Sequence, residues 1–313
     1  MSGTTKIEWT RNTDGSPGKT WNPSTGCSKV SKDGGCRLCY AEAIATRFRG
    51  TKAFPNGFDV TLHPERLEDP LRWRKPTNVF VNSMSDLWHP DIPDGFIGSV
   101  WNTMALARRH TFQVLTKRPQ RMASLLNGWE REGWMWRRDD MVWCGPLPGP
   151  LPNVHLGCSI ELDRYCFRAD SLRRTPAAVR FLSLEPLLDP LPSLDLLGID
   201  WVIVGCETGP GARPMDLGWV RDIRDRCRDL RRVVECSVCH GSMSVPVPGG
   251  GMACPACCDY DGRGGQGGEY QSVSGPALFI KQISGPKGQP ISQLEQFPPD
   301  LQIREFPPAP IPG

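Results

Sequence analysis

Six short runs of apolar residues recur along the chain, and polar residues follow each run. A strand that is buried on both faces is apolar at nearly every position, whereas a strand with one exposed face alternates. The runs therefore predict strands of a sheet that is covered on both sides. They extend over Asn78–Met84, Thr111–Lys117, Val154–Glu161, Val179–Glu185, Trp201–Glu207 and Ala277–Gln282.

Apolar residues at helical spacing lie between several of these runs. Phe96–Arg108 repeats apolar residues at intervals of three and four, and Leu217–Leu230 places Val220, Ile223 and Cys227 on one stripe. Strands that alternate with helices predict a parallel sheet, because each helix carries the chain back to the start of the next strand. The predicted fold class is α/β, most simply an open or closed β/α barrel.

Composition along the chain predicts four segments. Residues 1–232 are expected to form the main part of the barrel, and residues 276–285 its last strand. Residues 233–275 are rich in glycine and cysteine, which predicts a small inserted lobe without a large apolar core. Residues 286–313 are rich in proline and predict an extended tail over the surface.

Length, charge and cysteine content restrict the class of protein. The chain has 313 residues, of which 39% are hydrophobic, so it is long enough to bury a large core. Its net charge of +3 is too small to indicate a nucleic-acid partner by itself. No apolar run approaches the roughly 20 residues that cross a bilayer, and the first residues do not resemble a secretion signal. We therefore expect a cytoplasmic protein whose 13 cysteines are reduced or bind metal.

Polar side chains follow each predicted strand where the strand ends. In a β/α barrel the carboxyl ends of the strands converge on one mouth, so these side chains are expected to surround a single pocket. Some of them are equally well explained as helix N-caps. They are Asn82, Ser83, Asp86, Thr116, Lys117, Arg118, Ser159, Glu161, Ser183, Glu185, Glu207, Thr208, Lys281 and Gln282.

Three cysteines, Cys27, Cys36 and Cys39, precede a helix-forming run near the N-terminus. Three thiolates on a [4Fe–4S] cluster leave one iron free to bind a small molecule. A structural zinc site is the alternative, but it usually has four protein ligands, and residues 22–62 contain no fourth cysteine and no histidine. The three-cysteine loop therefore favours an iron–sulfur cluster.

The sequences NPSTGC and GCRLCYAE resemble the cysteine loop of radical S-adenosylmethionine (SAM) enzymes of the spore photoproduct lyase type. Together with TWNPSTGC, VNSMSDLWH, HTFQVLTKRP, LSLEPLL, WVIVGCETGPGARPM and FIKQISG, they are similar to an uncharacterised, largely phage-encoded family with a radical SAM type of fold. The resemblance covers nearly all of residues 6–285 apart from one insertion. The spacing from Cys27 to Cys36 is longer than in the usual radical SAM loop.

This resemblance implies a partial TIM-like (β/α) barrel in which Cys27, Cys36 and Cys39 hold a [4Fe–4S] cluster and SAM binds the free iron. It implies an enzyme that cleaves SAM reductively to a 5′-deoxyadenosyl radical, which then abstracts hydrogen from a substrate. An external electron donor is required, and a phage-encoded protein is expected in the host cytoplasm.

Strand-end residues are the expected contacts of SAM and substrate. Carboxylates are expected to accept hydrogen bonds from the ammonium or ribose of SAM, and Lys117, Arg118 and Lys281 to contact an anionic group. The predicted cofactor-binding residues are Asn82, Ser83, Asp86, Lys117, Glu161, Glu185, Glu207 and Lys281.

A second cysteine group lies in the inserted segment. Cys236 and Cys239 form one CxxC pair, and Cys254 and Cys257 form another. Two such pairs at this separation predict one closed Cys₄ zinc site, whose metal would supply the folding free energy of a small zinc-knuckle lobe. An auxiliary iron–sulfur cluster is the alternative, and Cys258 or His240 could replace one of the four ligands.

Two classes of function remain open from the sequence. The first is a radical SAM enzyme whose substrate is a nucleic acid or nucleotide. The second is a non-catalytic module that binds nucleic acid or protein, in which both cysteine groups are structural metal sites. Carboxylates at the ends of buried strands favour the enzyme, because a binding module does not need them in a deep pocket.

Overall fold

The computed structural model describes residues 3–132, 150–230, 275–285 and 289–307, together with the backbone of six short strands between these ranges. Those six strands form three antiparallel pairs, β7 with β8, β12 with β15 and β13 with β14. Their bounds are Trp136–Arg138, Met141–Trp143, Val234–Cys236, Val245–Val247, Gly251–Ala253 and Tyr270–Ser272, in chain order.

The centre of the structure is an eight-stranded sheet of order β1-β2-β5-β6-β9-β10-β11-β16. Every neighbouring pair is parallel except β1 with β2. The predicted α/β class and parallel sheet are thereby confirmed, but the sequence did not predict β1 and β2. The strands are Gly3–Thr4, Lys19–Trp21, Asn78–Val81, Thr111–Thr116, Val154–Ser159, Val179–Leu184, Trp201–Val204 and Ala277–Ile280 in sheet order.

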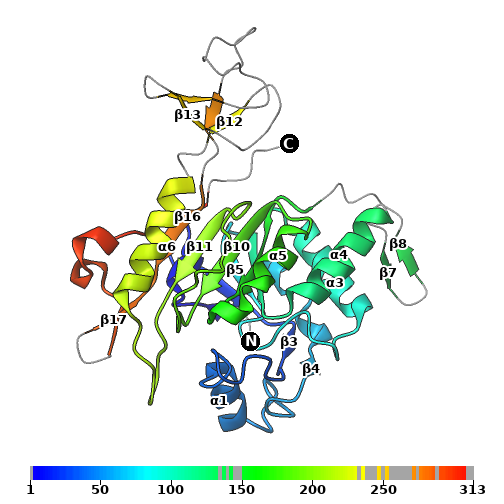
Figure 1. The fold of residues 1–313 in the computed structure, drawn as a ribbon. Coiled ribbons are helices and arrows are strands. Elements are labelled where there is room, and N and C mark those ends of the chain that lie inside the picture. Colours follow the sequence, from blue (N-terminus) through cyan, green and yellow to red (C-terminus); the bar gives the residue numbers. More distant parts are fainter. Residues whose placement is uncertain are drawn as a thin grey trace.

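Four helices connect these strands and pack against one face of the sheet (Figure 1). The predicted helix at Phe96–Arg108 is α3, displaced by two residues, and the one at Leu217–Leu230 is α6, with the predicted bounds. The helices are α3 Asp94–Leu106, α4 Pro119–Arg131, α5 Phe167–Arg173 and α6 Leu217–Leu230.

Alternate residues of β5, β10, β11 and β16 divide between two apolar clusters. In β10, Leu182 and Leu184 pack with the helices, whereas Phe181 faces the opposite side. There it joins a second cluster around Trp9, which comes from the 3-10 helix η1 (Glu8–Thr10). This Trp9 cluster consists of Trp9, Phe80, Phe181, Trp201, Ile203, Ala277 and Phe279. Burial of both faces explains why the strand sequences are continuously apolar.

No hydrogen-bonded pairing joins β1 to β16 in the described residues, so the sheet order has two ends. The Trp9 cluster fills the face that the helices leave uncovered, since Trp9 contacts rings from several strands. Its ring centroid lies 4.8 Å from that of Phe80, 6.0 Å from Phe181 and 6.1 Å from Trp201. Among the residues that the structure describes, no helix is long and apolar enough to span a bilayer.

A smaller lobe interrupts the chain between β2 and β5. It contains α1 and a two-stranded pairing of β3 with β4, and it lies below the sheet in the view of Figure 1. The remaining short elements border this lobe or the last strand. Their bounds are β3 Ser24–Thr25, α1 Tyr40–Arg47, β4 Thr61–Leu62, η2 Pro64–Arg66, α2 Asp69–Arg72, η3 Asp163–Tyr165, β17 Ile283–Ser284, β18 Pro290–Ile291, η4 Leu294–Gln296 and η5 Pro299–Leu301.

We expect Trp9→Ala to destabilise the protein by about 3 to 5 kcal/mol, because the buried indole would leave a cavity against three aromatic rings. The measurement is the shift of the urea unfolding midpoint, monitored by circular dichroism. Leu106→Ala is the matched control, since Leu106 is 61% exposed and its truncation should change the free energy of unfolding by less than about 0.5 kcal/mol. Equal effects of the two changes would contradict this role for Trp9.

Candidate active site

Polar residues continue the face of the Trp9 cluster beyond the carboxyl ends of the strands. Five of the predicted site residues follow a member of that cluster, or its partly buried neighbour Leu115, by two or four residues, and Glu161 follows the end of β9 by two. All six lie just past the carboxyl ends of the strands, next to the apolar cluster, and we call them the charged layer. They are Asn82, Lys117, Glu161, Glu185, Glu207 and Lys281.

Glu161 is fully buried in this charged layer, between two cations. Lys117 Nζ lies 3.0 Å from its Oε1, and Arg168 Nη1 donates to its Oε2 at 2.9 Å. Burial opposes the negative charge, but Lys117 and Arg168 outweigh it and hold the pKa of Glu161 below its ordinary value. Likewise, the carboxylate raises the pKa of Lys117 although burial opposes the positive charge. All three groups are therefore charged at neutral pH.

Glu207 forms a second charged contact through Arg213. Arg213 donates from its backbone N–H and from Nε to Oε2, each at 2.9 Å. The same guanidinium donates to the carbonyl oxygens of Asp33 and Gly34. Although burial opposes the charge, the hydrogen bonds from Arg213 lower the pKa of Glu207. Arg213 thus joins the end of β11 to the segment between two of the candidate cysteines.

Glu185 and Lys281 form the most accessible pair of the layer. Their side chains are 20% and 23% exposed, and Lys281 Nζ donates to Glu185 Oε1. The neighbouring Gln282 donates to the carbonyl of Cys206 at 2.8 Å and so fixes the end of β16. This pair presents one anion and one cation that solvent still reaches.

Asp86 has a different environment from the other carboxylates. Its Oδ1 accepts from the Thr116 hydroxyl at 2.7 Å and from the Trp88 backbone at 3.0 Å, and its Oδ2 accepts from the Lys117 backbone at 3.1 Å. The carboxylate therefore ties the loop after β5 to the end of β6.

Asn82 and Ser83 contact the segment that follows β2. Asn82, whose φ is +58°, donates from Nδ2 to the hydroxyls of Ser24 and Ser85, each at 2.7 Å. The Ser83 hydroxyl donates to Asn22 Oδ1 at 3.2 Å. These predicted site residues thus lie beside the strand end from which the three-cysteine segment begins.

The cysteine loop, residues 26–39, is held on the carboxyl side of the sheet. Gly26 has a φ of +86°, and a Cβ there would lie 2.3 Å from the carbonyl oxygen of Asp59. Its N–H donates to the Met84 carbonyl at 3.0 Å. At the middle of the loop, Arg168 donates to the hydroxyl of buried Ser31 at 2.8 Å. The arginine that neutralises Glu161 therefore also anchors the loop.

Close packing adds to these hydrogen bonds at two glycines of the loop. A Cβ on Gly35 would lie 2.9 Å from Pro186 and 3.1 Å from Glu161 Oε1, and one on Gly34 would meet Ser31 at 3.0 Å. The loop therefore lies directly against the charged layer, and its glycines permit this approach.

The start of the loop is fixed by Arg118 and His89. Arg118 donates to the carbonyl and the hydroxyl of Ser28 at 2.9 and 2.8 Å, and His89 Nε2 lies 2.7 Å from the same hydroxyl. The backbone N–H of Asp91 donates to His89 Nδ1, so Nε2 carries the proton and donates to Ser28. His89 therefore orients the serine and does not act as its base.

The thiols of Cys27, Cys36 and Cys39 are free and half-buried, whereas the other cysteines of the described residues, Cys158, Cys166, Cys206 and Cys227, are buried. Burial and the nearby Asp86 raise the pKa of the Cys27 thiol to about 11, and Arg118 partly offsets them. No group of three His, Cys, Asp or Glu side chains within the described ranges is arranged to hold a single metal ion.

A cluster of several irons makes a different demand, because each cysteine binds a separate iron. Each of the three thiols interacts electrostatically with at least one cation. These cations are Arg118 for Cys27, Lys117 and Lys29 for Cys36, and Lys29 for Cys39. Three half-buried thiols on one loop with cations nearby fit an anionic cluster bound by thiolates.

The chain matches the family model described as "Protein of unknown function (DUF5131)" over residues 4–233. It belongs to this DUF5131 family. The match includes the cysteine loop and every predicted site residue of the sheet except Lys281, and it ends before the second cysteine group. Comparisons with curated proteins and with solved structures found no match.

Sequence reasoning missed two arginines of this DUF5131 protein that organise the site. Arg168 lies in α5 and Arg213 in the loop after β11, and neither directly follows an apolar run. A signal was nevertheless present, because a buried carboxylate such as Glu161 requires a cation. The sequence did not indicate which of 37 lysines and arginines would supply it.

The predicted zinc ligands Cys239, Cys254 and Cys257 lie outside the described residues, as does the side chain of Cys236. The predicted Cys₄ zinc site therefore stays a prediction, as does its alternative of an auxiliary iron–sulfur cluster.

We expect Glu161→Ala to destabilise the protein by about 3 to 5 kcal/mol, because two cations would lose their buried partner. The pH dependence gives a second readout. Since folding lowers the pKa of Glu161 below its ordinary 4.5, its contribution is complete above pH about 4.5 and is lost as the pH falls through the folded value. Urea midpoints of Glu161→Gln should therefore fall less steeply below that pH than those of the wild type.

Glu130→Gln is the matched control for this titration, because Glu130 is exposed on α4. It should leave both the midpoint and its pH dependence unchanged. If Glu161→Gln left the fall of the urea midpoint at acidic pH unchanged, this pH-dependent stabilisation could not be assigned to Glu161.

Proposed function

We propose that this protein is a radical SAM-type enzyme. Cys27, Cys36 and Cys39 would hold a [4Fe–4S] cluster, and the fold would correspond to a partial (β/α) barrel of radical SAM type. The observation that carries the proposal is the attachment of one loop with three half-buried free thiols to the charged carboxyl ends of a parallel sheet. The motif resemblance and its largely phage-encoded family support the same proposal.

When bound and reduced, such a cluster supplies the electron that cleaves SAM into methionine and a 5′-deoxyadenosyl radical. The chain's own residues would bind and orient SAM and shield the radical from water. Glu185 and Lys281 form the most accessible pair of the charged layer, so we assign them to the ammonium and carboxylate groups of SAM. Glu161 is fully buried and contacts the loop through Arg168, so we assign it to loop position.

The Trp9 cluster would exclude water from the side of the charged layer that faces the centre of the sheet. Trp201 and Phe181 are fully buried, and Ile203 extends this apolar floor toward the charged layer. A reactive radical requires such a floor, because side reactions with solvent compete with transfer to the substrate. The remaining predicted contacts, Asn82, Ser83, Asp86, Lys117 and Glu207, would act by fixing the loops around the pocket.

A second candidate function is supported by one observation. Asp86, Glu161, Glu185 and Glu207 all have hydrogen-bonded or ionic partners within the chain. Carboxylates that are already satisfied suit a non-catalytic nucleic-acid- or protein-binding module with structural metal sites. The two functions differ in whether SAM binds and is cleaved.

We expect anaerobically reconstituted protein to contain close to four irons per chain, since a [4Fe–4S] cluster holds that number. The triple change Cys27→Ala, Cys36→Ala and Cys39→Ala should abolish this iron. Iron and sulfide analysis with EPR spectroscopy of the reduced protein provides the measurement. Cys166→Ala is the control, because this buried cysteine lies outside the loop and its loss should leave the cluster in place. A wild type that takes up only zinc would refute the enzyme proposal.

Dithionite-reduced protein should release 5′-deoxyadenosine from SAM without any substrate. Glu185→Gln should weaken SAM binding about 5- to 150-fold, the equivalent of a lost charged contact of about 1 to 3 kcal/mol. Calorimetry measures the affinity and chromatography the product, with exposed Glu130→Gln as the control. Iron-loaded protein that neither binds nor cleaves SAM would instead support the structural module.

A further inference from the structure

A stripe of exposed apolar side chains runs along α1. Tyr40, Ile44 and Phe48 are 55%, 36% and 44% exposed, and they stand four residues apart, on one face of the helix. Ala41 and Ala45, each one position after a member of the stripe, bury the adjacent face of the helix in a small cluster with Phe54. The stripe is therefore not part of the core, and two of its three members are aromatic.

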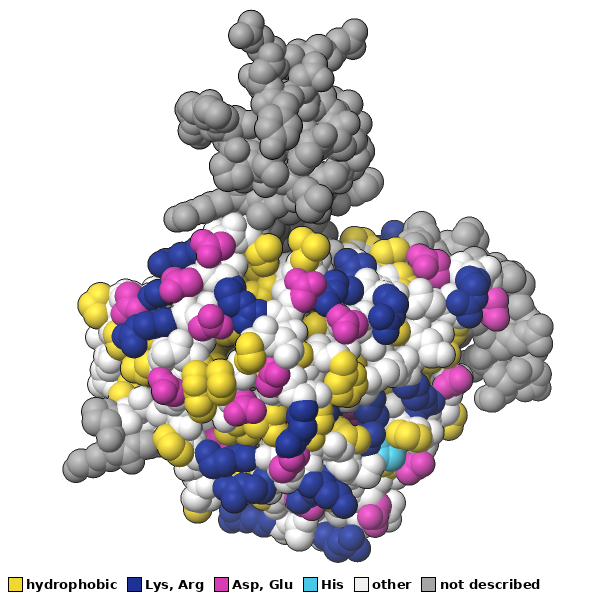
Figure 2. Space-filling view, in the orientation of Figure 1, with side chains coloured by type: hydrophobic (Ala, Val, Ile, Leu, Met, Phe, Trp, Pro, Cys, Tyr) yellow, Lys and Arg dark blue, Asp and Glu magenta, His cyan; other side chains and the backbone are white. Residues whose placement is uncertain are grey.

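Positive charge is concentrated around this stripe. Residues 28–52 contain six lysines and arginines and two acidic residues, a net charge of +4, whereas the whole chain carries +3. Lysine and arginine side chains gather over the lower part of the molecule in Figure 2, which is the lobe of α1 in Figure 1. The six basic residues are Lys29, Lys32, Arg37, Arg47, Arg49 and Lys52.

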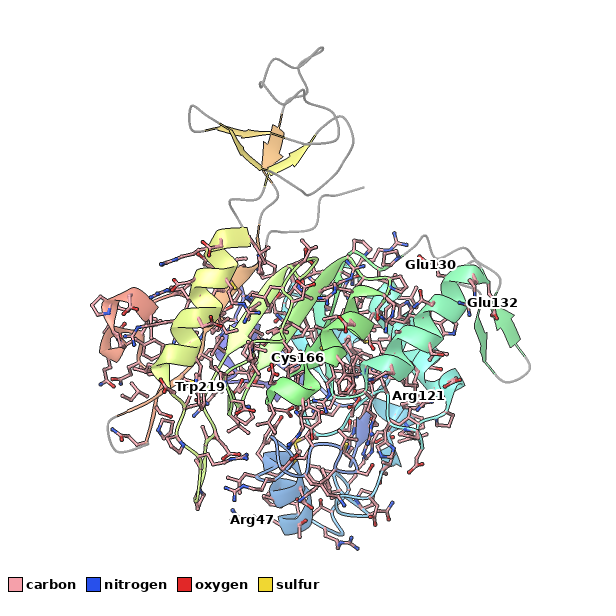
Figure 3. The ribbon with its side chains drawn as sticks, viewed as in Figure 1. Arg47, Arg121, Glu130, Glu132, Cys166 and Trp219 are labelled. Atoms are coloured by element: carbon pink, nitrogen blue, oxygen red, sulfur yellow. The ribbon has the colours of Figure 1, made fainter. Side chains whose placement is uncertain are left out.

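Several of these cations remain available to a ligand. Arg47 has no carboxylate partner among the described residues, and its guanidinium lies 5.6 Å from the centre of the Phe48 ring. It extends from α1 at the outer side of the lobe (Figure 3). Arg49 lies 3.6 Å from Asp59, but both side chains are mostly exposed, so that pair contributes little.

The stripe begins at the candidate active site. Tyr40 directly follows Cys39, and its hydroxyl donates to the carbonyl oxygen of Ser83. From there the exposed residues follow α1 away from the sheet, about 6 Å apart along the helix axis. A ligand on the stripe would therefore have one end beside the three-cysteine loop.

We infer that α1 and its basic flank bind single-stranded nucleic acid and lead it to the candidate active site. Proteins that bind single strands combine a basic surface for the phosphates with aromatic side chains on which bases stack. A second copy of this lobe would meet its own positive charge, and an eight-residue helix offers too little apolar area for a membrane surface. As a statement about substrate, the inference rests on the proposed enzyme, but binding itself does not require the cluster or SAM.

The test is fluorescence anisotropy with labelled oligothymidylate and oligouridylate of about 15 nucleotides, with a duplex as comparison. Protein without iron or SAM is used, so that failure of binding is separate from failure of the radical chemistry. We expect binding that weakens steeply with salt. Phe48→Ala should weaken it about 10-fold, and the pair Arg47→Glu and Arg49→Glu by more.

Matched controls distinguish binding at the α1 stripe from nonspecific electrostatic binding elsewhere on the protein. Phe167→Ala removes an equally exposed phenylalanine from α5, at 49%, and Arg108→Glu with Arg131→Glu reverses two exposed arginines elsewhere. Both controls should bind like the wild type. Tighter binding of DNA or of RNA would identify the natural strand and supports the inference.

Three outcomes would overturn it. The first is no affinity for any strand at low salt. The second is an affinity that the α1 variants and the controls reduce equally. The third is a dimer in solution that Phe48→Ala dissociates, because the stripe would then bind a second copy of the chain.

Discussion

The arrangement of the site depends on one buried negative charge. A carboxylate that water does not reach is stable only beside cations, and Glu161 has two, Lys117 from the end of β6 and Arg168 from α5. The unused donors of Arg168 then reach the carbonyl of Ser159 and the hydroxyl of Ser31. Neutralising one strand-end charge thus fixes a helix and the cysteine loop in the same step.

This constraint explains why the loop lies where it does. Its carbonyls at Asp33 and Gly34 accept from Arg213, which Glu207 orients, and its glycines allow backbone to approach Glu161 directly. Strand-end charges that would otherwise be costly to bury therefore act as anchors. The pair of Glu185 and Lys281 has no such contact with the loop in the described residues, and solvent still reaches it.

Two different surfaces meet at Cys39. On one side lies the charged layer above the Trp9 cluster, where each carboxylate is balanced by a nearby cation. On the other side lies the exposed stripe of α1, where basic residues outnumber acidic ones. A layer of paired charges suits the amino-acid group of SAM, which carries one ammonium and one carboxylate, whereas an unbalanced basic surface suits a polyanion. The proposed cofactor and the inferred substrate class would therefore bind in different electrostatic environments beside the same loop.

The sequence by itself determined the α/β class, the presence of all six predicted strands and the bounds of α6, because continuous apolar runs and a helical stripe are local patterns. Each of the six strands ends one to three residues before its predicted end, because the polar residues that follow the apolar run belong to the loops. It also placed Lys117, Glu161, Glu185, Glu207 and Lys281 at the carboxyl ends of the strands, which parallel strands bring to one edge of the sheet. It did not reveal β1 and β2, since two- and three-residue strands leave no apolar run.

Only the tertiary structure decided which charges meet. Arg168 follows Glu161 by seven residues, but Ser31, which shares that arginine, precedes it by 137. The exposure of Tyr40, Ile44 and Phe48 was equally hidden, because an apolar stripe on a helix ordinarily predicts burial. Local sequence predicts neither the ion pairs between distant residues nor the exposure of the α1 stripe, since both depend on how distant segments pack.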